Sequence, residues 1–158
     1  MTKRLLVVFL TTLGVLTVAY PAVAQPPTKS ESSIDLSGPH FLSGFCGFEI
    51  LHEGTLKVSS TVYPDGRVIE HIRVDAVLTA NGRSANENAR FTVTIEPEAG
   101  TVTLAGTPVN ISAAGEGLLV HDVGRIVRDL STGDVLSLAG QWMLLEDDTE
   151  KVCSYFAG

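Results

Sequence analysis

The chain has 158 residues, and its eighteen acidic and eleven basic side chains give it a net charge of −7. Nucleic acid is not an expected partner, because a chain of this acidity repels a polyanion. The length suits a single domain with one core.

The first 24 residues have the composition of an export signal. Lys3 and Arg4 precede an uncharged run from position 5 to 20, and Ala22-Val23-Ala24 is the small-x-small pattern that a signal peptidase cleaves. A helix that spans a membrane needs about 20 apolar residues. This run is shorter and stops at Pro21. We therefore expect cleavage after Ala24, no stable membrane insertion afterwards, and a secreted, extracellular protein. Without Lys3 and Arg4 the net charge becomes −9.

The next segment, residues 25–40, is predicted to be a flexible linker. Its sequence, QPPTKSESSIDLSGPH, contains three prolines and four serines and few side chains that a core would bury. The remaining residues, 41–158, are expected to form the single domain.

Within that domain, short glycine-containing turns separate stretches in which apolar and polar residues alternate. Pro64-Asp65-Gly66 and Asn81-Gly82 are two such turns. Alternation with a period of two predicts half-buried antiparallel strands. We expect about eight of them, at residues 45–51, 54–63, 67–79, 87–97, 101–106, 108–113, 118–130 and 134–146.

The fold class predicted from this pattern is all-β, an antiparallel meander. A meander of eight strands can close into a small barrel, which removes both sheet edges. A two-sheet β-sandwich is the alternative, because the same alternation suits it. Only the tail, residues 147–156, is a candidate for a short helical turn.

The two cysteines are expected to pair. Cys46 lies in the first predicted strand and Cys153 just past the last one, and an exported chain meets an oxidising environment. In a closed meander those strands are neighbours, so the bond would fasten the seam of the barrel. The spacing matches neither a CxxC redox motif nor a zinc pattern.

The densest polar cluster inside an apolar stretch lies in LLVHDVGRIVRDL, residues 118–130. His121, Asp122 and Arg125 are the candidate ligand-binding residues, and one of His121 and Asp122 is expected to point inward. Gly124 is a candidate β-bulge. The competing interpretation is that His121 is a surface residue and that the arginines pair with neighbouring aspartates.

Signatures of catalysis and of cofactor binding are missing from the sequence. It contains no GxSxG, HExxH, GxGxxG or phosphate-loop motif. The four histidines, at positions 40, 52, 71 and 121, show no metal-ligand spacing. The sequence therefore predicts no catalytic residues, no metal site and no cofactor.

Four short motifs resemble a set of small secreted actinobacterial proteins of unknown function. They are Cys46-Gly47-Phe48, Pro64-Asp65-Gly66, Gly124-Arg125-Ile126-Val127 and the terminal Cys153. The resemblance implies export and one β domain, and it implies no catalytic residue. The number of strands is also similar to that of lipocalin-like and allene-oxide-cyclase-like barrels, which is a likeness of fold alone.

These observations favour a secreted, disulfide-stapled β-barrel that acts as a non-enzymatic binding module. Its expected partner is a small apolar molecule inside the barrel or a cell-surface component. One alternative is a barrel-pocket enzyme of the cyclase or isomerase type, which requires His121, Asp122 or Arg125 to line a cavity. Another is a structural or inhibitory cell-envelope protein.

Overall fold

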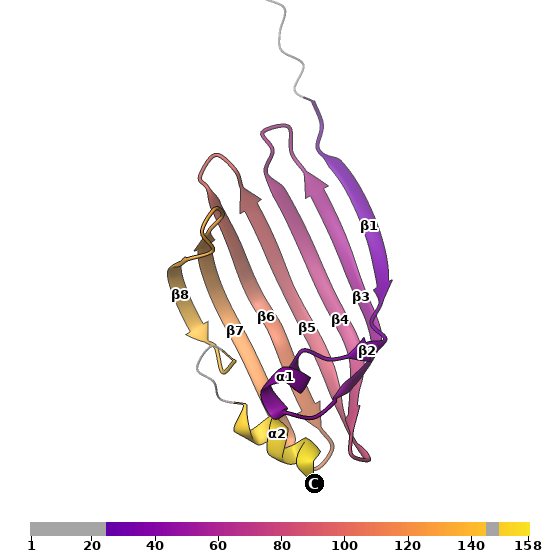
Figure 1. The fold of residues 1–158 in the computed structure, drawn as a ribbon. Helices are drawn as coiled ribbons and strands as arrows, with labels where there is room; N and C mark the ends of the chain where they lie inside the picture. The colour runs from indigo at the N-terminus through magenta and orange to yellow at the C-terminus, as the bar shows by residue number, and fades with distance from the viewer. Residues whose placement is uncertain (1–24, 145–148) are drawn as a thin grey trace, which may run out of the picture.

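The computed structural model describes residues 25–144 and 149–158, and Figure 1 shows their arrangement. The elements, in chain order, are β1 (Thr28–Asp35), β2 (Gly38–Pro39), α1 (Leu42–Cys46), β3 (Leu51–Val62), β4 (Val68–Ala80), β5 (Arg83–Glu96), β6 (Thr101–Ala113), β7 (Gly117–Asp129), β8 (Val135–Gln141) and α2 (Glu150–Ala157). None of the helices in these two ranges is long and apolar enough to span a membrane. The predicted signal, residues 1–24, lies outside the described residues.

The strands form one antiparallel sheet in the order β1-β3-β4-β5-β6-β7-β8, with β2 paired to the end of β3. From β3 onward each strand pairs with the next one along the chain. The predicted all-β antiparallel meander is therefore confirmed. The two short strands expected at residues 101–106 and 108–113 are one strand, β6, which a register shift interrupts between Gly106 and Val109.

The sheet begins earlier in the chain than the sequence indicated. The stretch expected to be a linker contains β1, whose eight residues all pair with β3, and β2. The side chains of β1 are exposed, which is why the segment has the polar composition of a linker. Backbone pairing to the edge of β3 depends little on side-chain hydrophobicity, so composition did not reveal it.

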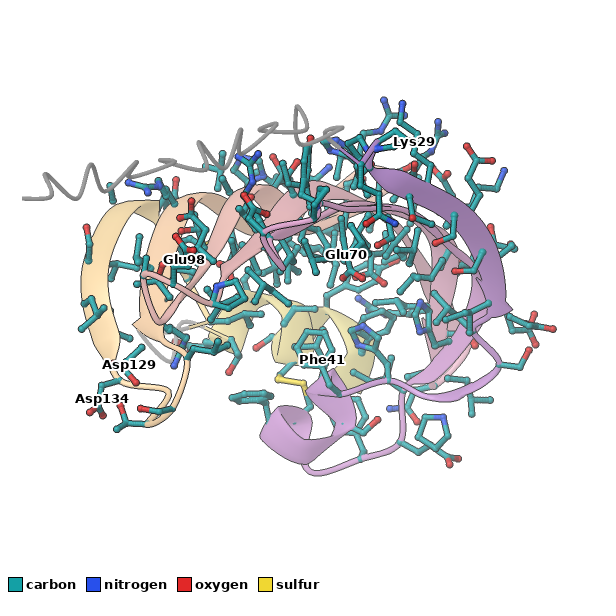
Figure 2. All side chains as sticks on the ribbon, turned by 90° about the horizontal axis from the view of Figure 1, so that it is seen from above. Lys29, Phe41, Glu70, Glu98, Asp129 and Asp134 are labelled. Carbon is teal, nitrogen blue, oxygen red and sulfur yellow. A yellow bond between two sulfur atoms is a disulfide. The ribbon has the colours of Figure 1, made fainter. Side chains whose placement is uncertain are left out.

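The described sheet is open. The edge strands are β1, which pairs with β3, and β8, which pairs with β7. β1 and β8 lie at opposite edges of the sheet (Figure 1). Closure into a barrel is thus not observed, nor is a second sheet that would make a sandwich. Figure 2 shows the sheet curving over both helices, which lie against the same face. We call this the inner face and the opposite one the outer face.

The predicted disulfide is present, but it joins helices rather than strands. Cys46 and Cys153 are bonded with their Cα atoms 5.1 Å apart. Cys46 is the last residue of α1 and Cys153 lies in α2, whereas the sequence placed Cys46 in a first strand at residues 45–51. The bond therefore clamps the two helices together on the inner face and does not fasten a seam between edge strands.

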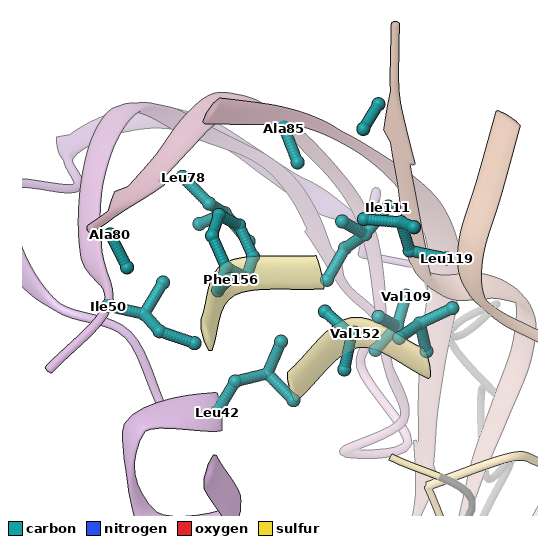
Figure 3. Close-up of a cluster of buried hydrophobic side chains, with 12 residues drawn as sticks. Leu42, Ile50, Leu78, Ala80, Ala85, Val109, Ile111, Leu119, Val152 and Phe156 are labelled. Atoms are coloured by element: carbon teal, nitrogen blue, oxygen red, sulfur yellow. The ribbon is translucent and has the colours of Figure 1, made fainter. Parts of the chain in front are cut away.

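The main core lies between these helices and one end of the sheet (Figure 3). Leu42 of α1 and Val152 and Phe156 of α2 are completely buried against Leu78 of β4 and Ile111 of β6. Val152 and Phe156 are four residues apart, so they share one face of α2. Complete burial of each such side chain contributes about 1.5–3 kcal/mol.

Polar contacts fix α2 at the turn between β4 and β5. The Asn81 side chain donates a hydrogen bond to the Phe156 carbonyl at 2.9 Å, and the Tyr155 hydroxyl donates one to the Ser84 carbonyl at 2.7 Å. Asn81 has φ 51°, a left-handed conformation that asparagine tolerates better than most residues. The predicted Asn81-Gly82 turn thus also serves as a docking point for the last helix.

We predict that replacing both cysteines by serine lowers the free energy of unfolding by about 4–5 kcal/mol, because the bond closes a long loop. The cysteines are 107 residues apart in the sequence. Urea unfolding followed by circular dichroism measures the difference. Reduction of the wild-type protein should lower stability by a similar amount. Equal stability of the oxidised wild type and the double variant would show that the clamp contributes nothing.

Candidate metal centre

The three residues singled out in β7 do not come together. Asp122 is on the inner face and 3% exposed, whereas His121 and Arg125 have the opposite parity and lie on the outer face, Arg125 exposed. The expectation that one of His121 and Asp122 points inward is confirmed. A common pocket built from all three is not formed.

Their observed contacts are structural. An Asp122 carboxylate oxygen accepts a hydrogen bond from the Leu144 backbone at 3.2 Å, and the His121 ring lies 3.2 Å from the Asn110 side-chain oxygen. Gly124 has φ 149°, and a Cβ there would overlap the Ala139 carbonyl of β8. The bulge expected at Gly124 lies beside it, in β6, where the register shifts just after Gly106, the cross-strand partner of Gly124.

A different polar cluster is buried beneath the sheet, formed by His40, His52 and Glu87. One carboxylate oxygen of Glu87, Oε2, lies 3.1 Å from His52 Nε2 and 3.5 Å from His40 Nε2. One potential ligand atom from each residue lies within 4.8 Å of the other two. The side chains of His40 and Glu87 are only 3% and 6% exposed, and that of His52 is 13% exposed.

The register of the sheet brings Glu87 and His52 together across the intervening strand. Glu87 of β5 is opposite Ala76 of β4, and His52 of β3 is opposite Leu78. Because the Ala76 side chain is a single methyl group, the Glu87 carboxylate can extend over it toward β3. Gly54 leaves room on the far side, where a Cβ would overlap Ala76.

His40 reaches the cluster from the segment between β2 and α1. Its backbone N–H donates to the Ile50 carbonyl at 2.7 Å, and its carbonyl accepts from Ser43 at 3.0 Å in the first turn of α1. The Ser43 hydroxyl accepts from the Ile50 N–H at 2.9 Å. These bonds hold the β2–α1 segment over the end of β3, and the disulfide at Cys46 fixes the far end of α1.

The cluster is a polar layer between two apolar regions. On one side is the main core, with Leu42 and Ile50, and on the other is a smaller cluster of Val74, Ala76 and Ala89. His52 Nε2 and Glu87 Oε2 contact each other at ion-pair distance, and within the described parts of the chain neither atom has a well-aligned hydrogen bond to another group. Buried polar atoms normally have all their partners, so this layer has room for a further ligand atom.

Burial lowers the pKa of His52 below the ordinary value of 6.5, and the neighbouring His40 lowers it further, while the Glu87 carboxylate partly offsets both. The neutral imidazole, which is the form that binds a metal ion, is therefore favoured near pH 7. Glu87 places a carboxylate oxygen beside the two imidazole nitrogens.

Two of the three separations in the cluster match those around a metal ion. Ligand atoms about 2.0–2.1 Å from a tetrahedral zinc ion are about 3.3 Å apart, and the two separations from Glu87 Oε2 are 3.1 and 3.5 Å. All three atoms lie within 4.8 Å of one another, so the two imidazole nitrogens have to move closer together when an ion binds. Two imidazoles and one carboxylate form a ligand set that divalent zinc and other first-row ions accept, with a further position open to water.

This cluster was missed in the sequence because its members are far apart along the chain and occur in no known pattern. His40 falls in the segment taken for a linker, and the first strand was expected to end before His52. A signal was nevertheless present in Ala85-Asn86-Glu87-Asn88-Ala89. In this stretch Glu87 alternates in step with Ala85 and Ala89, so all three side chains point to the same face of the strand. Because the two alanines are apolar, that face is expected to be the buried one.

Comparisons with known proteins add no assignment. No family model, curated protein or solved structure matches the chain. The resemblance to small secreted actinobacterial proteins stays a prediction.

We predict that, with a chelator present, stability falls as the pH drops from about 7.5 to about 5.5 and that His52 carries part of this loss. The folded-state pKa of His52 is lowered, so the unfolded chain binds the proton first. The stability that uncharged His52 contributes is fully present above about pH 6.5, the ordinary pKa of histidine in the unfolded chain. It is lost as the pH falls from there through the lower pKa of His52 in the folded protein.

Urea unfolding at several pH values measures this. His52→Gln should flatten the pH dependence, and His71→Gln should leave it unchanged, since His71 is an exposed histidine on the outer face of β4. A His52→Gln protein with the full wild-type pH dependence would contradict the assignment.

Proposed function

We propose that the protein is an exported, disulfide-stapled β-sheet module that binds a divalent first-row transition metal ion, zinc in the first instance, at His40, His52 and Glu87. The observation that carries the proposal is the position of Glu87 Oε2, 3.1 and 3.5 Å from two imidazole nitrogens in a buried layer. Export is supported by the signal-like sequence of residues 1–24 and by the disulfide.

In this proposal each side chain has a defined role. Glu87 supplies an anionic oxygen, and His40 and His52 supply neutral Nε2 atoms. His40 Nδ1 accepts a long 3.4 Å hydrogen bond from the Leu42 N–H. Coordination through Nε2 moves the ring proton to Nδ1, so that weak bond is given up. A bound ion would compensate by replacing the His52–Glu87 contact as the partner of both buried atoms.

The metal ion would also hold the fold together. His40 belongs to the segment before α1, whereas His52 and Glu87 belong to two strands of the sheet. An ion bound to all three would tie α1 to the sheet at one end, while the disulfide ties it to α2 at the other. Because no unfolded chain presents this site, metal binding adds directly to folding stability.

A binding role is favoured over catalysis. His121, Asp122 and Arg125, which the enzyme hypothesis requires to line one cavity, are divided between the two faces of β7. The apolar ligand expected inside a closed barrel is not part of the proposal either, because the described sheet is open. The proposed ligand is therefore an ion rather than a small apolar molecule.

Titration calorimetry of the chelator-treated, oxidised protein with zinc chloride tests this proposal. We predict one zinc ion per chain, with affinity falling as the pH drops below about 6.5 because protons compete for the imidazoles. Glu87→Gln and His52→Gln should each weaken binding by more than about 100-fold, since loss of a ligand costs more than loss of an outer-shell partner.

His71→Gln and Glu116→Gln are matched controls, because both residues are exposed and lie outside the cluster. Both variants should bind zinc as the wild type does. Circular dichroism should confirm that all four variants fold. Cobalt(II) provides a second readout, since a tetrahedral site with nitrogen and oxygen ligands gives a visible absorption band. Zinc binding that survives both Glu87→Gln and His52→Gln would eliminate the site.

A further inference from the structure

The helices cover only one end of the inner face, and the other end carries an apolar surface that the described residues leave partly exposed. We call it the open patch. At its centre are the inward-facing residues of β4, β5 and β6, namely Val68, Ile72, Val93, Ile95, Val102 and Leu104. It continues to Val62 on β3, which is 44% exposed, and to Leu138 on β8, which is 51% exposed.

The outer face of β5 and β6 in this half of the sheet is polar rather than apolar. Thr92 and Thr94 of β5 and Thr101 and Thr103 of β6 alternate with the apolar residues of the open patch. One face of this half of the sheet is thus lined with hydroxyl groups and suits water, while the other is lined with branched apolar groups. An apolar sheet face is normally buried against a second layer, and the helices supply that layer only at the other end (Figure 1).

The open patch has two charged side chains, and they have opposite signs. Glu70 projects from β4 and Arg128 from β7, both on the inner face. β5 and β6 lie between these two strands, and Arg128 is two residues farther along the strands, so the two backbone positions are about 16 Å apart. Within the described residues neither makes an ion pair. Arg128 Nη1 donates to the Gly133 carbonyl at 3.0 Å, which leaves the other guanidinium N–H groups for a carboxylate. The midpoint between them is the middle of the open patch.

We propose that the open patch is the dimer interface of this protein, and that a second copy covers it face to face to form a two-sheet sandwich. A two-fold axis that runs along the strands between β5 and β6 places β4 of one copy over β7 of the other. Each Glu70 then lies opposite Ile126 of the second copy, one inward-facing position from its Arg128. The two ion pairs formed in this way select a second copy over an uncharged occupant.

The size of the open patch fits a modest interface. Six strands, β3 to β8, span about 24 Å, and six residues along each strand span about 20 Å. The projected area of the open patch is therefore about 500 Å² on each copy. The two copies together would bury about 1,000 Å², which is the lower limit expected of a specific interface. A dimer that dissociates at low concentration is therefore expected, and it does not depend on metal binding.

A charge-exchange experiment tests this arrangement by analytical ultracentrifugation of the oxidised protein. Glu70→Arg and Arg128→Glu should each raise the dimer dissociation constant by about tenfold or more, because each places like charges opposite each other across the interface. The combined Glu70→Arg/Arg128→Glu variant should return it to within about threefold of wild type. The two charges are too far apart within one chain to restore each other internally.

A second pair of variants separates the two faces of β6. Leu104→Asp puts a carboxylate in the centre of the open patch, in a position that is partly exposed in a single copy, and should give a folded monomer. Thr103→Asp, one residue away on the outer face, should leave the dimer intact. Far-ultraviolet circular dichroism and the intact disulfide confirm folding of both variants.

A protein that is monomeric at all accessible concentrations would overturn the proposal. A dimer unaffected by Leu104→Asp, as expected if the exposed edge strands β1 or β8 paired instead, would overturn it as well. A bound lipid seen by native mass spectrometry on a wild-type monomer would assign the open patch to an apolar ligand and reject the second copy.

Discussion

The structure depends on the contact between two short helices and one end of a single-layer sheet, held by the Cys46–Cys153 bond. Neither helix is long enough to be stable alone, since α1 has five residues and α2 has eight. Docked together, they bury Leu42, Val152 and Phe156 completely. The packing of these side chains in the core therefore stabilises both helices, and the disulfide holds the two helices close to the core.

The same docking creates the polar layer. His40 lies two residues before Leu42, the first residue of α1, so the position of that helix decides whether the imidazole lies over Glu87 and His52. A buried carboxylate between two imidazoles costs desolvation free energy, and an apolar substitute would pack between the two hydrophobic clusters without that cost. Metal coordination is the role proposed above for these three groups, and it would offset this cost.

In the half of the sheet beyond the polar layer, the inner face is left partly exposed, because no described element covers it. Antiparallel sheets commonly have one face in water, but here it is the outer, threonine-lined face that is suited to it. The uncovered apolar face thus follows from the small size of the helical layer, which spans only part of the sheet.

Much of the sheet could be predicted from the sequence, because alternation and turn residues act locally. The hairpins at Pro64-Asp65-Gly66 and Asn81-Gly82 and the strands around them are present, as is the cysteine pairing. The parts that could not be predicted depend on tertiary contacts. β1 consists of exposed polar residues that pair through the backbone alone. α1 took the place of an expected strand because Leu42 and Cys46 dock on α2 and the core.

The cluster of His40, His52 and Glu87 was harder to predict, because it unites residues from a loop and two non-adjacent strands. Sequence spacing detects metal sites when the ligands share one turn or one helix, and His40, His52 and Glu87 do not. The polar residues that did attract attention in β7 alternate between faces, so their closeness in sequence placed them on opposite sides of the sheet. Closeness in space followed instead from strand register and from the small size of Ala76.

The most direct test of this account is a crystal structure of the oxidised protein grown with zinc, with diffraction data collected on both sides of the zinc absorption edge. The account predicts an anomalous peak about 2.0–2.2 Å from His40 Nε2, His52 Nε2 and a Glu87 oxygen, beneath a sheet whose helices are joined by the disulfide. A fully supplied crystal with no anomalous peak at these three residues, or with His40 turned away from the sheet, would contradict it.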